Sequence, residues 1–591
     1  MTGLMLNSPI KRLWAHLAPR RKKQLTLLFI ATVITSLAEV VSIGAVLPFL
    51  GVLISPEKVF SNVYIQPIVT ILEITELHQL LLPLTLLFVT TAIFAGGMRF
   101  ILIWAQTRIG HAIGADLSSQ TYEKILYKPY SFHVSRNSSE IIAGVSVKSN
   151  TVVYGSLLPL LTAASSALIL ITILTALVII DPLIASVLFG GFGTVYAVIA
   201  VLFGRRLTKN SESISLETNQ VIKALQEGLG GIRDVLIDGN QAVYCKIYRF
   251  AQLPLRRAKA NTEIISASPK FLMETLGIVL IAALAYALAG REGGLAAAIP
   301  LLGALAIGAQ RLLPVLQQLY SSWSSLRGDQ ASLEDILDLI EQPLPDYARG
   351  PTSERLSFTK SIKLNNISFR YSDQTPWVLQ DITLEIPKGS RVGFLGTTGS
   401  GKSTLLDILM ALLPPVKGGM LIDETSITEQ NFRGWQSNIS HVPQSIFLAD
   451  VTIAENIAFG VPLEKIDYQR VERVAQQAQI SDTIESWEKG YKTFAGERGV
   501  RLSGGQRQRI GIARALYKHA DIIVFDEATS ALDNETEAAV MGSIEGLGRH
   551  ITVLIIAHRL STLKYCDQII ELSEGRIKFI GAYNEMIRRV A

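Results

Sequence analysis

The sequence is poor in cysteine and in charged residues, and each shortage excludes a class of protein. Cys245 and Cys566 are the two cysteines in 591 residues, which excludes a disulfide framework and a CxxC metal motif. Charged residues make up 18% of the chain, a low share for a soluble protein. The net charge is only +5, whereas nucleic-acid-binding domains usually carry a concentrated basic patch. We therefore expect no nucleic-acid partner.

Hydrophobic residues are abundant instead, at 49% of the chain with a mean hydropathy of +0.34. The later part of the chain has the composition of an ordinary charged α/β domain, so the apolar excess lies before about residue 325. The sequence thus predicts an all-α transmembrane domain fused to an α/β P-loop nucleotide-binding domain. We place the transmembrane domain at residues 1–340, a Pro/Gly-containing linker at 341–355 and the nucleotide-binding domain at 356–591.

Six apolar stretches in the first domain are long enough to cross the roughly 30 Å hydrocarbon core of a bilayer, which takes about 20 helical residues. The third and fourth are separated by Asp181-Pro182, a charged break and a helix stop. The predicted spans are 24–53, 80–106, 156–180, 183–203, 271–290 and 294–320.

Basic residues predict the orientation of these spans. They precede the first span at Arg20 to Lys23 and gather in the two long loops at about 107–153 and 204–268. Because such loops stay on the cytoplasmic side, we expect a multi-pass protein of the cell membrane, in bacteria the inner membrane, with both termini cytoplasmic. The apolar run after Lys23 is too long for the core of a cleaved secretory signal.

The two long loops combine charge with helical periodicity, so we expect the spans to continue as helices beyond the bilayer. Proline or glycine interrupts the helical pattern at Lys128 to His133 and at Gly228 to Asp234. Each break is predicted either to dock on the nucleotide-binding domain or to form a solvated turn.

The segment GTTGSGKST matches the phosphate-binding pattern G-x-x-x-x-G-K-[ST]. Its small residues let successive backbone N–H groups surround phosphate, while Lys402 reaches the terminal phosphates and Ser403 offers a hydroxyl to Mg²⁺. A short strand before it and a helix from about Ser403 would place the phosphates at the positive end of that helix. The predicted nucleotide-binding residues are Gly396, Thr397, Thr398, Gly399, Ser400, Gly401, Lys402, Ser403 and Thr404.

Two further segments complete the predicted chemistry. The apolar run that begins at Ile522 predicts a parallel strand that ends at Asp526, whose carboxylate can hold the Mg²⁺ shell. Glu527 follows and is placed to polarise the attacking water. In LSGGQ, Ser503 is predicted to cap an amphipathic helix that begins near Gln506, and the free N–H groups of such a helix attract phosphate.

These segments, together with HVPQ, GERG, SALD and IIAHRLST, resemble the motif set of the ATP-binding cassette transporters in order and in spacing. Six spans ahead of one cassette resemble an exporter-type half-transporter. The resemblance implies an ATP-driven translocase with ATP and Mg²⁺ as cofactors.

The resemblance also implies a role for individual residues. Glu527 would be the catalytic base, Gln444 would sense Mg²⁺ and water, and His558 would contact the γ-phosphate. Tyr371 would lie against adenine, although it could instead be a core aromatic of a strand. The implied metal-binding residues are Ser403, Gln444 and Asp526, and the implied nucleotide contacts also include Ser503, Gly504, Gly505, Gln506 and Asp533.

In the resembled family two cassettes pair head to tail, so that each nucleotide lies between the phosphate loop of one cassette and the signature LSGGQ of the other. One cassette per chain therefore implies a homodimer with two composite sites. ATP binding and hydrolysis would drive alternating access.

Charged residues inside the spans are candidates for substrate binding. Arg99 and Arg311 lie among apolar residues, where an arginine is costly; they could bind an anionic headgroup or pair with Glu39 and Glu274. The segments SLAEVVSIGAVLPFL and AQRLLPVLQQL are similar to parts of bacterial flippases for lipid-linked oligosaccharides. The alternatives are a multidrug, lipid A-like or peptide exporter and, outside transport, an ATP-gated channel or sensor.

Overall fold

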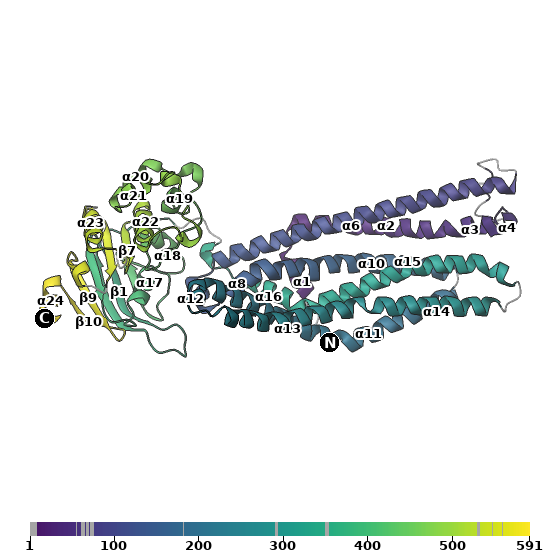
Figure 1. The fold of residues 1–591 in the computed structure, drawn as a ribbon, viewed down its shortest axis with the longest axis horizontal. Helices are drawn as coiled ribbons and strands as arrows, with labels where there is room; N and C mark the ends of the chain where they lie inside the picture. Colours follow the sequence, from purple (N-terminus) through teal and green to yellow (C-terminus); the bar gives the residue numbers. More distant parts are fainter. Residues whose placement is uncertain are drawn as a thin grey trace. The chain divides into compact units, whose positions relative to one another are not determined.

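The computed structural model describes residues 9–54, 56–60, 66, 70, 76–180, 182–289, 294–348, 354–528, 532–546, 548–557 and 560–590. Contacts within the chain divide it into two compact units (Figure 1). Unit 1 comprises Met1–Tyr127 and Ser135–Pro343, and unit 2 comprises Lys128–Val134 and Leu344–Ala591.

The described secondary structure of unit 1 consists of helices joined by short connections, and the long helices lie side by side (Figure 1). Close packing joins α2 to α6, α10 to α15, α11 to α13 and α14 to α15. The helices are α1 (Pro9–His16), α2 (Pro19–Gly44), α3 (Val46–Ile54), α4 (Pro56–Phe60), α6 (Leu81–Leu126), α8 (Ser138–Ile142), α9 (Ser149–Val152), α10 (Leu158–Ile180), α11 (Pro182–Gly230), α12 (Ile232–Ile237), α13 (Gln241–Ala267), α14 (Pro269–Ala289), α15 (Gly294–Gly328) and α16 (Gln330–Glu341).

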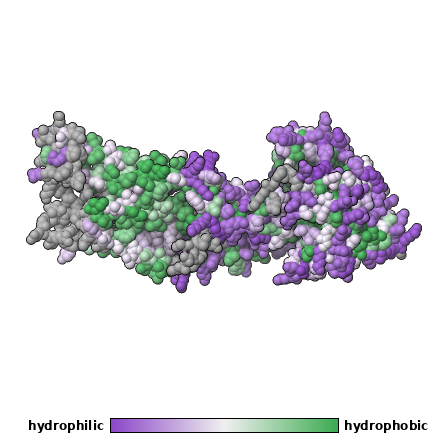
Figure 2. Space-filling model, turned by 180° about the vertical axis from the view of Figure 1, so that it is seen from behind, coloured by the Kyte–Doolittle hydropathy of each residue, from purple (hydrophilic) through white to green (hydrophobic). Residues whose placement is uncertain are grey.

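Three described helical segments are long and apolar enough to cross a membrane: Pro19–Ser42, Leu81–Leu126 and Ser138–Ala176. They contain most of the first three predicted spans. The other three predicted spans fall on α11, α14 and α15, and the total of six remains a prediction. Apolar side chains gather over the surface of these helices, whereas the surface of unit 2 is mostly hydrophilic (Figure 2).

The first predicted span is not one helix, because α2 ends at Gly44 and α3 begins at Val46. Pro48 lies in the first turn of α3, where its ring would clash with the carbonyl of Gly44 in a continuous helix. The first predicted span, 24–53, is therefore divided between two helices.

The helices continue well beyond the predicted spans, as expected: α6 runs to Leu126, α11 to Gly230 and α15 to Gly328. Both predicted breaks interrupt a helix. After α6 the chain enters α7 (Tyr130–Ser135), and after α11 it turns at Gly231 into α12. By its contacts Lys128–Val134 belongs to unit 2, which favours docking over a solvated turn for this break.

A buried polar network ties together the part of unit 1 that lies outside the predicted spans. The Lys148 ammonium, 6% exposed, lies 2.6 Å from the Asp335 carboxylate of α16 and donates to Ser215 Oγ at 3.0 Å. Ser215 in turn donates to Asp335. Three segments distant in sequence are thus held by one buried cation, which lies at the end of a π-helical turn (Ala143–Lys148).

Unit 2 contains two β-sheets. The first has four antiparallel strands in the order β2-β1-β4-β5: β1 (Ser361–Phe369), β2 (Leu379–Pro387), β4 (Lys417–Ile422) and β5 (Thr425–Ser426). The second has the order β10-β9-β3-β8-β7-β6 and is parallel except for β10: β3 (Arg391–Leu395), β6 (Ile439–Val442), β7 (Ile522–Asp526), β8 (Thr552–Ile556), β9 (Gln568–Ser573) and β10 (Arg576–Gly581).

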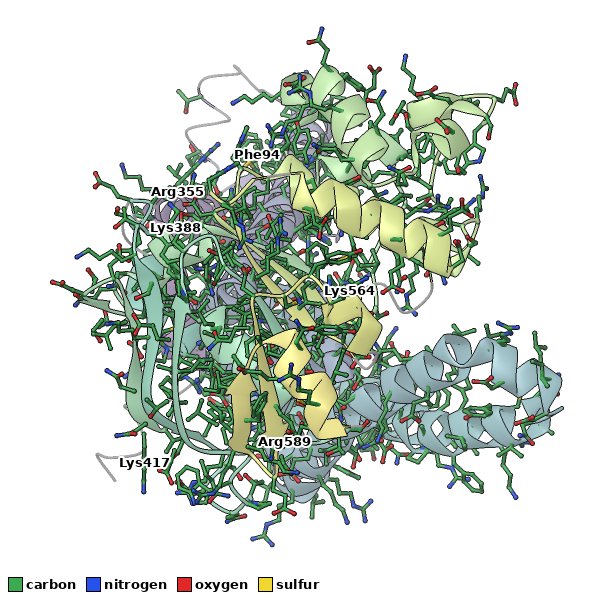
Figure 3. All side chains as sticks on the ribbon, turned by 90° about the vertical axis from the view of Figure 1, so that its left-hand side faces the viewer. Phe94, Arg355, Lys388, Lys417, Lys564 and Arg589 are labelled. Atoms are coloured by element: carbon green, nitrogen blue, oxygen red, sulfur yellow. The ribbon has the colours of Figure 1, made fainter. Side chains whose placement is uncertain are left out.

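Alternate residues of the six-stranded sheet enter two separate cores, as the pleat of a strand requires. On one face Ile522 and Val524 pack with α17 (Lys402–Leu409). On the other face Ile523 and Phe525 pack with α22 (Gly504–Tyr517) and with α19 (Ile453–Ile457) and α20 (Tyr468–Gln477). Charged side chains such as Lys388, Lys417 and Arg589 cover the outside of the unit (Figure 3).

The Lys148 network generates a stability prediction. Asp335→Ala leaves the Lys148 ammonium buried without its carboxylate, so we expect the free energy of unfolding to fall by about 2–3 kcal/mol. Denaturant unfolding of the protein in detergent measures this change in the free energy of unfolding.

The double variant Lys148→Met/Asp335→Ala should recover part of this loss, because it removes the unpaired charge as well. Glu334→Ala, on the same helix, is the control and should change stability by less than about 0.5 kcal/mol. The single variant Lys148→Met completes the cycle. If the stability lost in the double variant equals the sum of the losses in Lys148→Met and Asp335→Ala, the two residues are not coupled.

Candidate active site

The phosphate-binding pattern forms a tight turn between β3 and α17. Gly396, Gly399 and Gly401 have φ of 153°, 83° and 99°, values that residues with a side chain rarely adopt. A Cβ at Gly396 would lie 2.3 Å from the carbonyl oxygen of Leu572, and one at Gly401 would lie 2.7 Å from the Leu379 side chain. Glycine is therefore required at both positions, and the N-terminal N–H groups of α17 stay accessible to an anion.

Lys402, the first residue of α17, folds back over the turn. Its Nζ donates to the carbonyl oxygens of Gly396 at 2.7 Å and Thr397 at 2.9 Å. Burial lowers the pKa of Lys402, while the nearby Glu527 and Asp526 carboxylates act in the opposite direction. The Ser400 hydroxyl is buried without a hydrogen-bond partner among the described residues. A cationic turn with an unsatisfied donor fits a phosphate group.

The carboxyl ends of neighbouring parallel strands bring the catalytic candidates together. Asp526 ends β7, as predicted, and Glu527 follows with a left-handed φ of 50°. Gln444, just beyond β6, donates from Nε2 to Glu527 Oε2 at 2.6 Å. Since β6 pairs with β7, two side chains 83 residues apart meet at one sheet edge. This oxygen-rich edge beside Lys402 fits a hydrated Mg²⁺.

Tyr371 lies just after β1 and is 52% exposed. Its ring packs edge-on against Phe369 with centroids 5.1 Å apart, and its hydroxyl is 3.1 Å from the Thr404 hydroxyl on α17. The alternative that Tyr371 belongs to the core is therefore wrong. Its exposed face next to the phosphate turn is available to a base.

Ser503 caps α22, as predicted. Its hydroxyl accepts from Gln506 N at 3.2 Å and Gln506 Oε1 accepts from Ser503 N at 2.8 Å, a reciprocal capping box. The helix begins at Gly504, two residues before the predicted start, because the cap lies at Ser503. Gly504 and Gly505 thus begin α22, and their N–H groups, which have no acceptor within the helix, can face an anion.

The remaining predicted site residues either have other contacts in the structure or lie outside the described residues. Asp533 caps α23 (Asn534–Glu545), where Oδ1 accepts from Thr536 N at 2.9 Å. His558 and the side chain of Arg311 lie outside the described residues. Arg99 Nη1 lies 3.8 Å from Glu39 Oε1, so the predicted pairing of Arg99 with an acidic residue of the spans is present. Glu274 instead lies 3.8 Å from Lys270.

Two residues near the site escaped the sequence analysis. Asp407 lies on the apolar helix α17, and burial together with the nearby Asp526 raises its pKa to about 6. Arg514 of α22 donates to the carbonyl oxygens of Asn456 at 2.8 Å and Phe447 at 2.9 Å, which ties the signature helix to the loop after Gln444. The signal in each case is a charged residue at an otherwise apolar helix position.

Comparison with known proteins agrees with this geometry. Residues 379–530 match the family described as ABC transporter, and residues 25–299 match the ABC transporter transmembrane region. An ATP-dependent lipid A-core flippase of Burkholderia pseudomallei (strain 1710b) is 30% identical over 495 residues, which are 81% of this chain and 80% of the relative. A protein of the same name from Alkalilimnicola ehrlichii is 29% identical over 534 residues, 88% of each chain.

The fold is similar to that of a solved bacterial Atm1-family ABC exporter with ATP bound. The TM-score is 0.78 at 23% identity, over 97% of this chain and 96% of the other. Transmembrane region, phosphate turn and signature helix thus occur together in one chain, and its similarity to the relatives extends over most of their length. The chain belongs to the ABC transporter family and is an ATP-hydrolysing membrane transporter with the exporter fold.

Proposed function

We propose that this ABC transporter works as a homodimer with two composite ATP sites and moves an amphipathic lipid with an anionic, sugar-bearing headgroup across a bacterial inner membrane. The observation that carries the proposal is the separation of the two phosphate-binding elements within one chain. α17 packs on one face of the six-stranded sheet and α22 on the opposite face.

This separation supports the homodimer. The N-terminus of α22, capped by Ser503, and the phosphate turn before α17 both suit an anion, but they belong to helices on opposite sides of the sheet. A second copy in head-to-tail orientation would bring its Ser503, Gly504, Gly505 and Gln506 to the phosphate held at Lys402. Two identical sites follow from the symmetry.

Within each site, the hydrolytic step requires a base beside the terminal phosphate. We assign this role to Glu527, which Gln444 orients through the 2.6 Å hydrogen bond. Bound Mg²⁺, with Ser403, Gln444 and Asp526 as its predicted ligands, would supply charge neutralisation. In this proposal Lys402 binds the phosphates, Tyr371 contacts adenine, His558 contacts the γ-phosphate and Asp533 is a further contact to the nucleotide.

The lipid substrate is supported by the relatives and by Arg99. Several relatives are named ATP-dependent lipid A-core flippase, which favours a lipid A-like glycolipid over the lipid-linked oligosaccharide predicted from the sequence. Both carry an anionic headgroup that a guanidinium can bind. The Arg99 side chain is 33% exposed and the 3.8 Å separation from Glu39 is longer than a hydrogen bond, so its donors remain available to a headgroup. Arg311 is the second candidate.

The remaining parts of the proposal concern placement in the cell. We infer six spans, with residues 1–340 as the transmembrane domain, 356–591 as the nucleotide-binding domain and both termini in the cytoplasm. Lys128–Val134, whose contacts place it in unit 2, would transmit closure of the cassettes to α6.

An ATP-gated channel or sensor would need no steady turnover, whereas a lipid transporter hydrolyses ATP continuously.

The first test concerns the base. Glu527→Gln should retain ATP binding and lower kcat by about 10²–10⁴-fold, the usual contribution of a positioned base. The measurement is ATPase activity in lipid nanodiscs beside ATP binding. Glu574→Gln is the control, since Glu574 also has φ of 50° but lies in the β9–β10 turn; it should keep full activity. Parental turnover in Glu527→Gln would disprove the assignment.

The second test concerns the composite sites. Two subunits are purified as a mixed dimer in the Glu527→Gln background, one carrying Lys402→Ala and the other Ser503→Arg. In the composite arrangement one site keeps both of its halves, so the mixed dimer should retain one ATP while each parental homodimer retains almost none. If the mixed dimer binds no more ATP than its parents, each site is built from a single subunit.

The third test concerns the substrate. Steady ATPase activity should rise with a lipid A-like glycolipid or a lipid-linked oligosaccharide and not with neutral phosphatidylcholine, and Arg99→Gln/Arg311→Gln should abolish the rise. The matched control is Arg327→Gln, at the far end of α15. Stimulation that survives in the double variant would rule out the headgroup role, and equal stimulation by phosphatidylcholine would rule out headgroup recognition altogether.

A further inference from the structure

The helical path from α13 to α14 is interrupted at a single residue. α13 ends at Ala267 and α14 begins at Pro269, although Ser268 between them keeps helical dihedrals, with φ of −61° and ψ of −33°. Proline has no N–H, so the carbonyl oxygen of Ile265, four residues before Pro269, cannot accept its usual helical hydrogen bond. The break is therefore caused by a missing backbone donor.

Two side chains of α15 donate to carbonyl oxygens at this break. Tyr320, 5% exposed, donates from its hydroxyl to the Ile265 oxygen at 3.2 Å. Gln317 Nε2 donates to the Ser266 oxygen at 3.0 Å. Gln317 is itself held, because its Oε1 accepts from the Tyr196 hydroxyl of α11 at 2.9 Å. A neighbouring helix thus supplies the donor that proline removes, as a membrane protein with a broken helix requires.

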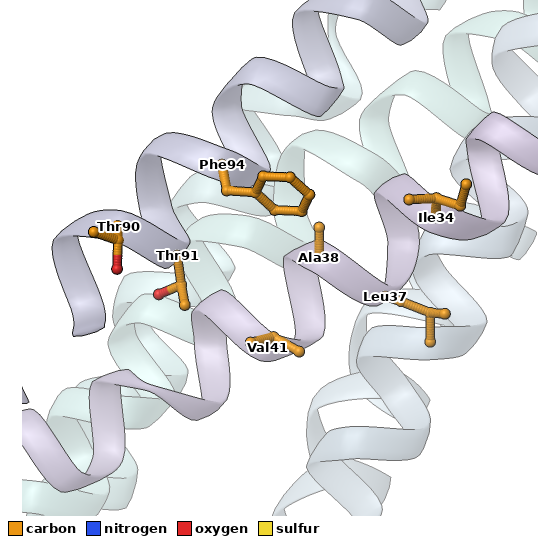
Figure 4. A pocket seen from close by; sticks show the side chains of 7 residues that line it. All are labelled: Ile34, Leu37, Ala38, Val41, Thr90, Thr91 and Phe94. Atoms are coloured by element: carbon orange, nitrogen blue, oxygen red, sulfur yellow. The ribbon is translucent and has the colours of Figure 1, made fainter.

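Other residues of unit 1 show what is particular about this arrangement. Thr90 and Thr91, which line an apolar pocket between α2 and α6 (Figure 4), donate to carbonyl oxygens of their own helix. Pro254 also lacks a donor, yet α13 continues through it, and this proline is exposed, so water can bond to the carbonyl oxygen that it frees. At Pro269, which is buried, the donor comes from a distant helix instead.

α15 packs against the chain on both sides of the break. On the α13 side Gly328 lies against Thr262, where a Cβ on the glycine would be 2.6 Å from the threonine methyl. On the α14 side Met273 shares a buried cluster with Leu316. The two donors lie between these contacts along α15, so a change in the angle between α13 and α14 must strain or break their hydrogen bonds.

We propose that the α13–α14 junction is a hinge of the transport cycle and that Gln317 and Tyr320 are its latch. Hinges are a few residues at the ends of elements that absorb a change of backbone angle, and Ser268 has that place here. With both donors bonded, the junction is held; when α15 withdraws them, α14 swings about Ser268. Opening leaves the buried Ile265 oxygen without a donor, which costs free energy that nucleotide binding must supply. The two latch residues position the helices, and the hinge does not depend on which substrate is carried.

Hydrogen exchange tests the hinge directly. The full-length transporter in nanodiscs is compared without nucleotide and with a non-hydrolysable ATP analogue and Mg²⁺, and exchange is measured for the amides of residues 266–273. We expect the rates in the two states to differ by at least about fivefold, the slower state being the latched one. Tyr320→Phe should speed exchange in the latched state by about fivefold, as the loss of one hydrogen bond predicts. Equal rates in the two states would overturn the proposal.

Restoring the backbone donor distinguishes a latch from a packing contact. Pro269→Ala gives position 269 an N–H, so the Ile265 oxygen can be bonded within a continuous helix. In this background Tyr320→Phe should no longer change the exchange rates, whereas in a Pro254→Ala background it should keep its full effect. Tyr286→Phe, at a position 86% exposed on α14, is the matched control and should change nothing. An equal effect of Tyr320→Phe in the parent and in Pro269→Ala would exclude the latch.

Turnover shows whether the transporter uses the hinge. Pro269→Ala makes the helix continuous, so it should remove the difference in exchange between the two nucleotide states and lower the kcat of steady ATP hydrolysis several-fold. Pro254→Ala is the control and should keep both the difference and the parental kcat. Parental turnover in Pro269→Ala, with the exchange difference intact, would show that the junction is a static kink.

Discussion

The parallel pairing of β6, β7, β8 and β3 is the constraint on which the nucleotide site depends. Parallel strands end at the same edge of a sheet, so the turn after β3, the carboxylates after β7 and the amide after β6 share one location. Gln444 and Glu527 meet there only because Val442 pairs with Phe525. A register shift of one residue in that pair would place Gln444 on the other face and remove the hydrogen bond.

The same sheet also separates the N-termini of α17 and α22, the two helix ends that we propose to bind phosphate. Alternate residues of β7 face opposite cores, and each core holds one of the helices. The alternation along β7 gives the sheet two apolar faces, of which α17 covers one and α22 the other. A strongly bent Glu527 backbone at the junction, with φ of 50°, is the kind of local strain that is retained at functional sites.

Local patterns allowed much of this to be predicted from the sequence. The glycine spacing around Lys402, the apolar run that ends at Asp526 and the cap at Ser503 are short-range signals. The structure has the turn, the strand end and the cap where they were predicted, although α22 begins at Gly504, two residues before its predicted start. The fold class followed from the contrast between apolar and charged halves. The π-helical turns Ala143–Lys148 and Val153–Leu157 have no short-range signature that the analysis could use. The roles of Asp407 and Arg514 depend on contacts with distant segments, which periodicity does not reveal.

In the proposed dimer, energy transfer from ATP to the spans requires that ATP bind one conformation better than another, because a ligand with equal affinity for both shifts nothing. A change from 1:99 to 99:1 takes about 5.5 kcal/mol of differential binding. A site complete within one subunit would bind ATP equally in open and closed dimers. A site that needs Ser503 of a second copy gains those contacts only on closure, so the separation of α17 from α22 is what would allow nucleotide to drive transport.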